Sequence, residues 1–317
     1  MNDLKSLYLC EYLVVIRAVE DLNIPQHAGS ALRGVFGRAL RKLACETGLP
    51  DCKSCELKAR CLYCYIFETL PAAGQSYGRF SSPPNPYLFS PVNTKEHTIL
   101  PGEVYSFVIS LIGRANKYLP HIVTALIEMG NIGLFKGRGR YELTEIHSLG
   151  LDGKKTEIYS VSDKTIRPAG KAISIEAFAD MKKEQDGVAL VFETPARIKA
   201  DGDLAVGLPF RLIMERLYER AILLDYFHCG GSGEKDENYF GNIDTVEILE
   251  NRLTWFDPER ISFRSKQKIR IGGHLGRISY SGPVGKCLPL LKFGEHLHIG
   301  KGTTIGLGKY RVETDIS

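Results

Sequence analysis

The chain has 317 residues, 44% of them hydrophobic and 25% charged, which is the composition of an ordinary soluble globular protein of about two domains. Its 41 Lys and Arg against 37 Asp and Glu give a net charge of +4, too small by itself to indicate an anionic partner. The N-terminus lacks a signal-peptide pattern and no apolar run reaches about 18 residues, so we expect a cytoplasmic protein without a membrane span.

The first half of the chain alternates strand and helix patterns. β-Branched and aromatic residues over 7–18 predict a strand. Ser30 is the predicted N-cap of a helix whose apolar stripe runs at helical spacing from Leu32 to Leu43. Further patterns predict strands at 87–90 and 103–112, a helix at 116–128 with Gly130 as its C-cap, and a closing strand at 140–147. The resulting order, βαββαβ, is that of a ferredoxin-like fold.

A cysteine-rich segment, residues 45–64, interrupts this order after the first helix. In a reducing compartment, two Cys-x-x-Cys pairs separated by five residues favour a metal over disulfides. Four thiolates make a closed tetrahedral site for a structural zinc; an iron–sulfur cluster, or a compact knot without metal, remains an alternative. The predicted ligands are Cys52, Cys55, Cys61 and Cys64.

The second half repeats the order after a polar, irregular stretch at 151–180, which we expect to be a linker with room for an edge strand. A strand is predicted at 188–194, and Pro209 begins a helix that reaches residue 227. Strands at 245–256 and 268–280, a short helix at 288–293 and a last strand complete the half.

A glycine-rich loop precedes the last strand of each half. Residues 133–141 and 302–310 share the pattern Gly-x-x-x-Gly-x-Gly-basic-Tyr, at an offset of 302 − 133 = 169 residues. An offset near half the length indicates a duplicated domain. Glycine allows positive φ and close approach of a ligand to the backbone, so the loop is a candidate phosphate site, with a tight turn as the alternative reading.

These observations predict an α+β protein of two tandem ferredoxin-like (RRM-like, βαββαβ) domains. The first domain, residues 1–150, carries the cysteine-rich insertion at 45–64; the second, residues 181–317, carries the glycine-rich loop near the C-terminus. The linker between them is placed at 151–180.

The whole pattern resembles one known superfamily. Its most specific parts are residues 29–37 (Gly-Ser-Ala-Leu-Arg-Gly-Val-Phe-Gly), the Cys-Tyr-Ile-Phe-Glu end of the cysteine segment, and residues 297–308. Together with the tandem βαββαβ order and the two loops, they resemble the repeat-associated mysterious proteins of CRISPR systems, and among these the endoribonuclease that processes precursor CRISPR RNA. The resemblance implies binding of CRISPR repeat RNA as precursor and mature crRNA, contact with other CRISPR effector subunits, and cleavage inside the repeat without a cofactor.

The implied chemistry is metal-independent attack of a ribose 2′-hydroxyl on the adjacent phosphate, for which histidine is the best acid or base near neutral pH. The family places a histidine on or near the first helix. That helix has none here, and His27 just before it is the candidate, with a loop histidine of no catalytic role as the alternative. His298 and His274 are the fallback candidates.

A non-catalytic subunit that holds crRNA in an effector complex has the same fold and is the alternative function. A general RNA-binding module of the RRM kind is a weaker reading, because aromatic RNP patterns are absent. The residues expected to contact RNA are basic side chains on the first helix and both glycine loops with their flanks: Arg33, Arg38, Lys136, Arg138, Arg140, Lys301, Gly302, Gly306, Gly308 and Lys309.

Overall fold

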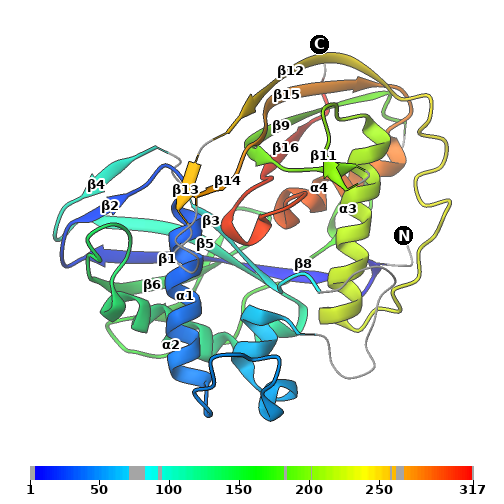
Figure 1. The fold of residues 1–317 in the computed structure, drawn as a ribbon. Helices are drawn as coiled ribbons and strands as arrows, with labels where there is room; N and C mark the ends of the chain where they lie inside the picture. Colours follow the sequence, from blue (N-terminus) through cyan, green and yellow to red (C-terminus); the bar gives the residue numbers. More distant parts are fainter. Residues whose placement is uncertain are drawn as a thin grey trace. The chain divides into compact units, whose positions relative to one another are not determined.

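The computed structural model describes residues 4–70, 83–91, 95–181, 184–200, 202–257, 259–261 and 268–315. They fall into two units (Figure 1). The N-terminal unit is Tyr8–Ile173 with Phe227–Gly230, and the C-terminal unit is Ser174–Tyr226 and Gly231–Ser317 with Met1–Leu7. Of the points at which the chain changes unit, the one between Ile173 and Ser174 lies inside the stretch 151–180.

The N-terminal unit is built on one antiparallel sheet and two helices. Its main elements are β1 (Tyr8–Ala18), α1 (Ala28–Ala44), β3 (Tyr87–Pro91), β5 (Val104–Ile112), α2 (Leu119–Ile132), β6 (Tyr141–Leu149) and β7 (Lys155–Ser160). The sheet order is β3-β5-β1-β6-β7, so the four strands of the βαββαβ unit stand in the ferredoxin-like order and β7 extends the edge. A small antiparallel pair, β2 (Leu22–Ile24) with β4 (His97–Ile99), and β8 (Ile173–Ser174) complete the strands.

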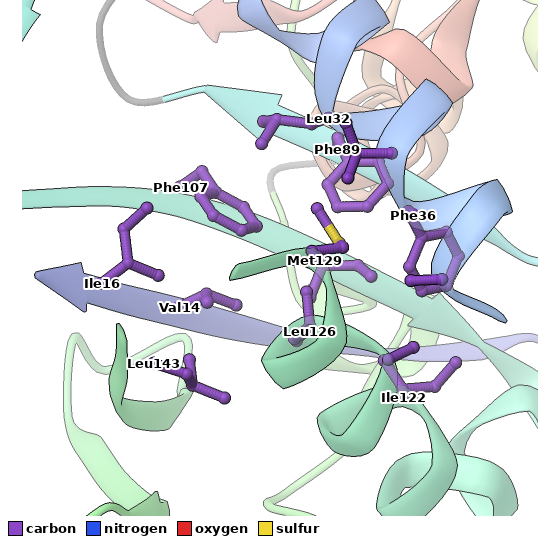
Figure 2. Close-up of a cluster of buried hydrophobic side chains, with 14 of the residues drawn as sticks. Val14, Ile16, Leu32, Phe36, Phe89, Phe107, Ile122, Leu126, Met129 and Leu143 are labelled. Carbon is purple, nitrogen blue, oxygen red and sulfur yellow. The ribbon is translucent and has the colours of Figure 1, made fainter. Parts of the chain in front are cut away.

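The core of this unit lies between the sheet and the two helices. Residues of β1 alternate between buried and partly exposed positions, as a half-buried strand requires. Figure 2 shows side chains from the sheet, α1 and α2 meeting in one apolar cluster. Its fully or almost fully buried members include Val14, Ile16, Leu32, Phe36, Phe89, Phe107, Ile122, Leu126, Met129 and Leu143.

The C-terminal unit repeats the same topology. Its elements are β9 (Gly187–Ala196), α3 (Phe210–Leu224), β12 (Glu247–Phe256), β15 (Gly273–Ser281), α4 (Leu288–Leu297) and β16 (Tyr310–Glu313). The sheet order β12-β15-β9-β16 is again the ferredoxin-like order with all neighbours antiparallel. Two short pairs accompany it, β10 (Lys199–Ala200) with β11 (Asp203–Leu204) and β13 (Glu259–Ile261) with β14 (Lys268–Arg270). The fold prediction, two tandem ferredoxin-like units, is confirmed.

The two tyrosines that end the repeated glycine motif occupy the same place in both units. Tyr141 begins β6 and its hydroxyl donates to the carbonyl of Leu126 in α2 at 2.5 Å. Tyr310 begins β16 and donates to the carbonyl of Leu291 in α4 at 2.8 Å. The last strand is therefore anchored to the second helix by the same bond in each unit, which agrees with duplication.

Several predicted element ends were wrong, among them one end of each of the helices α1, α2 and α3. Helix α1 begins at Ala28 with His27 at the N-cap, so Ser30 lies in its first turn and is not the N-cap. Helix α2 continues past Gly130 to Ile132, and Gly133, with φ 84°, is its C-cap. Gly130 is required for packing, because a Cβ there would lie 2.3 Å from the Tyr141 carbonyl oxygen.

The third wrong end is that of α3, which stops at Leu224 and is followed by a π-helical turn, Asp225–Cys229. Among the described helices, none combines the length and apolar character needed to cross a membrane.

Candidate functional site

Helix α1 carries a basic face supported by an aromatic ring that follows the cysteine-rich segment. Arg38 is exposed, while the half-buried Arg33 places its guanidinium 4.4 Å from the centre of the Phe67 ring. Gly37 makes room for that ring, because a Cβ at this position would lie 2.3 Å from it. Phe67 in turn stacks on Tyr63 at 5.4 Å between ring centres. A cation held over an aromatic face is fixed in direction, so Arg33 is ordered before any ligand arrives.

His27 occupies the N-cap of α1, at one end of this basic face. Its side chain is partly buried, and its Nε2 atom lies out of contact with solvent. Burial lowers the pKa of His27 below its ordinary value of 6.5, because the charged imidazolium is the form that loses most hydration. His27 is therefore neutral near pH 7, the state in which an imidazole accepts a proton.

The two fallback histidines are buried in the C-terminal unit. Burial, together with the nearby cations Lys309 and Arg220, lowers the pKa of His298 to about 3. Its Nδ1–H donates to the Leu307 carbonyl at 3.3 Å, which ties the end of α4 to the glycine loop. His274 donates from Nε2 to the Ala205 carbonyl at 2.8 Å. Both contacts are structural, and proton transfer to RNA from either ring would require this unit to open.

The glycine loop of the N-terminal unit presents three exposed basic side chains, Lys136, Arg138 and Arg140. Arg140 is partly neutralised, since its guanidinium lies 2.8 Å from the Glu20 carboxylate. In the described part of the chain, no carboxylate pairs with Lys136 or Arg138. Arg138 has a φ of 54°, which projects it from a left-handed turn of the loop. Two uncompensated cations therefore remain available to a phosphate.

The glycine loop of the C-terminal unit is held mainly by its own hydrogen bonds. The amide of Gly306 donates to the Thr303 carbonyl at 2.9 Å, and that of Gly308 donates to the Pro195 carbonyl at 3.0 Å. Both glycines have positive φ, 84° and 69°. These two residues thus have a turn-forming role that is visible in the structure, and their amides are already engaged.

The two lysines that flank this loop differ. The ammonium of Lys309 lies 2.9 Å from the Glu193 carboxylate, whereas Lys301 is exposed and has no ion-pair partner among the described residues. Gly302, with φ 80°, precedes a single turn of 3-10 helix, Thr303–Ile305. Lys301 is the side chain of this loop best placed to meet a phosphate.

The four cysteines of the predicted knot line one cavity of about 500 Å³ in the N-terminal unit. Cys55 and Cys64 are buried, and Cys52 and Cys61 are partly buried. Burial raises the pKa of the Cys64 thiol, and the neighbouring Cys61 and Cys52 raise it further. Within the described ranges, however, no three His, Cys, Asp or Glu side chains gather closely enough to hold an ion. The donor chemistry fits a thiophilic metal, but the thiols do not converge on one point.

The sequence reasoning did not find the Phe67 ring beneath Arg33, nor the Glu20 and Glu193 partners of Arg140 and Lys309. A signal for the first was present, because Gly37 on the inner side of an otherwise regular helix indicates close approach of another group. The two carboxylates come from other strands and loops, and nothing in their local sequence marks them.

Two family models match the chain. The model described as "AF_1859_N: N-terminal domain" matches residues 7–171, slightly more than half of the chain. The model described as "CRISPR-associated endoribonuclease Cas6" matches residues 190–310, from the first strand of the C-terminal unit through its glycine loop. An uncharacterized protein of Archaeoglobus fulgidus is 28% identical over 303 residues, covering 92% of this chain and 93% of its own.

Several solved structures share the fold at low sequence identity. A Cas6 product complex matches with a TM-score of 0.55 and 16% identity, over 96% of this chain and 99% of that chain. Thermus thermophilus Cas6 matches with a TM-score of 0.55 and 12% identity, over 97% and 99%. The chain also covers 47% of a chain in a partial Cas6-RT-Cas1–Cas2 complex, at TM-score 0.55 and 15% identity, and so spans about half the length of that relative.

The solved structures support the tandem ferredoxin-like fold, and the family models cover both units between them. The chain belongs to the family described by the AF_1859_N model, and residues 190–310 of its C-terminal unit match the Cas6 endoribonuclease model.

Proposed function

We propose that this protein is an endoribonuclease that cuts CRISPR repeat RNA to give mature crRNA. The observation that carries the proposal is the match of the Cas6 endoribonuclease model to residues 190–310, in a chain whose two units both have the ferredoxin-like order. The match to a family of endoribonucleases does not favour the alternative function, a non-catalytic crRNA-binding subunit. The partners of the proposed endoribonuclease would be precursor and mature crRNA, and other CRISPR proteins.

The proposed reaction needs no metal. The 2′-oxygen attacks the adjacent phosphorus, the bond from phosphorus to the 5′-oxygen breaks, and the products are a cyclic phosphate and a 5′-hydroxyl. His27 is the proposed base, because its lowered pKa keeps the ring neutral and able to take the 2′-hydroxyl proton. Basic side chains stabilise the charge that develops on the phosphate oxygens, and water supplies the proton to the departing oxygen.

RNA binding is assigned to exposed basic groups that lack an acidic partner. Arg38 on α1, Lys136 and Arg138 on the first glycine loop, and Lys301 on the second meet this description within the described chain. Arg140 and Lys309 would have to leave a carboxylate in order to bind a phosphate, so each contributes less to the free energy of RNA binding.

Lys301→Ala is expected to weaken RNA binding through lost charge without affecting stability. Losing one phosphate contact should flatten the slope of log affinity against log salt by about 0.7 to 0.9. Affinity measured at several salt concentrations checks this, with Lys199→Ala as the control, since Lys199 is exposed in the same unit and its ammonium donates to the Gly202 carbonyl at 2.6 Å. An unchanged slope for folded Lys301→Ala protein would remove Lys301 from the interface.

The function itself is tested by incubating the protein with its own repeat RNA in EDTA. We expect one cut within the repeat and a cyclic phosphate at the new 3′ end. Tight binding of the intact repeat with no cut, with and without added Mg²⁺, would support the scaffold alternative instead. Cutting that occurs only with Mg²⁺ would keep the nuclease and overturn the metal-independent mechanism.

A further inference from the structure

We propose that Cys52, Cys55, Cys61 and Cys64 bind a thiophilic metal centre that holds the cysteine-rich segment closed against α1. The proposal is independent of the RNA chemistry, because these thiols line a cavity of their own at the end of α1. The metal would be structural, since four thiolates leave no open coordination position.

The segment has almost no apolar core of its own. From Glu46 to Arg60 every residue is exposed or partly exposed except Cys55. Leu49, the largest apolar side chain available at its start, is 44% exposed. Ordering a stretch of this length costs backbone conformational entropy at every residue, and so little buried surface does not offset that cost. A metal bound by residues at both ends of the stretch supplies the missing free energy.

The backbone already presents the cysteines as two knuckles. In the first, the Cys55 amide donates to the Cys52 carbonyl at 3.3 Å, which closes a tight backbone turn between the two cysteines. In the second, the Tyr65 amide donates to the Cys61 carbonyl at 3.0 Å, and Cys64 begins a π-helical turn, Cys64–Glu68. The Cys64 side chain interacts with those of both Cys61 and Cys52, so the two pairs are in contact through Cys64.

The remaining step is a closure. Because no three donors converge in the described structure, binding must draw the knuckles together by reducing the cavity. A single zinc requires sulfurs about 2.3 Å from one point, whereas an iron–sulfur cluster takes the same four thiolates at separate irons. Cys45 lines the same cavity but stands outside both pairs, 4.0 Å from the Thr47 hydroxyl, which in turn is 3.6 Å from the Cys55 sulfur. It is the matched control for the ligand set.

The closure would also order the basic face of α1. Arg41 donates to the carbonyl of Leu49 and lies 5.7 Å from the Tyr63 ring, while Arg33 lies over Phe67. Leu49 comes before the first knuckle, and the two rings lie within or just after the second. Metal binding would therefore fix Leu49, Tyr63 and Phe67, the residues that contact Arg41 and Arg33. The metal itself would not contact RNA.

The test is the metal content of protein purified anaerobically, without chelator, from medium supplied with zinc and iron. We expect either one zinc per chain, or iron with equal sulfide and visible absorption; both outcomes support the centre and identify its type. Cys55→Ser should lose most of the metal and melt at a clearly lower temperature, whereas Cys45→Ser should keep both properties.

A second measurement avoids dependence on the folding of the variant. Wild-type protein stripped of metal and titrated with Co²⁺ should develop the intense thiolate-to-cobalt absorption of a tetrahedral four-sulfur site, and digestion within residues 45–64 should slow as cobalt binds. Protein that contains no zinc or iron and shows no such absorption would overturn the proposal. Metal retained by Cys55→Ser but lost from Cys45→Ser would overturn the assigned ligand set.

Discussion

His27→Ala is expected to slow cleavage of the repeat RNA by about 10²–10⁴-fold, the usual contribution of a positioned general base. RNA affinity should stay nearly unchanged, because a proton acceptor acts on the transition state and not on ground-state binding. Single-turnover cleavage with protein in excess, measured beside equilibrium binding, separates the two effects. Unaltered cleavage by this variant would contradict the role assigned to His27.

The pH dependence of the cleavage rate tests the role of His27 further. Burial lowers the pKa of His27 below 6.5, so the neutral base persists through neutral pH and is lost only as the pH falls through the lowered value. Wild-type cleavage should therefore show an acid limb below pH 6.5, and the residual activity of His27→Ala should lack it. His97→Ala is the control, since this partly exposed histidine of the same unit bonds through Nδ1 to the Lys95 carbonyl and should retain both the rate and the limb.

Gly308→Val is expected to lower the free energy of unfolding by about 2 kcal/mol or more. Its φ of 69° already strains an L side chain by about 1–3 kcal/mol. In addition, a Cβ there would lie 1.8 Å from the Ile299 carbonyl oxygen, which is backbone and cannot move aside cheaply. Thermal and denaturant unfolding measure this loss.

Gly207→Val is the matched control in the same unit, because a Cβ at Gly207 meets nothing within 4 Å. It should unfold like the wild type. RNA binding by the folded fraction of Gly308→Val should approach normal, since the Gly308 amide is bonded to Pro195 and its role is to form the turn. A variant as stable as wild type that fails to bind RNA would instead make Gly308 a direct contact.

The tandem fold was predictable because its signals are local and occur twice. The run of β-branched and aromatic residues at 7–18 and the repeated motif ending at Tyr141 and Tyr310 are both visible in the sequence. The helix ends were less predictable. Ser30 has the chemistry of an N-cap, but the helix begins three residues earlier, almost a full turn, because Ala28 and Gly29 are buried. Gly130 resembles a C-cap, yet the close approach of Tyr141 explains it better.

The sequence indicated which types of residue lie at the candidate site, but not what each of them does there. Lysines and arginines beside glycines indicate a phosphate site, but the pairing of Lys309 with Glu193 depends on β9 lying next to β16. Likewise, His298 belongs to a promising motif, and only the structure shows its ring buried and bonded to Leu307. Burial and partners across strands are tertiary properties, and sequence spacing does not encode them.

The central claim, RNA cleavage by 2′-hydroxyl attack, is tested most directly with two repeat RNAs that differ at one atom. Once the cut has been mapped, the nucleotide before it is made as its 2′-deoxy form, and both RNAs are incubated with the protein in EDTA. We predict cleavage of the unmodified RNA with a cyclic phosphate end, and equal binding but no cleavage of the deoxy RNA. Cleavage of the deoxy RNA at the same bond would contradict the mechanism.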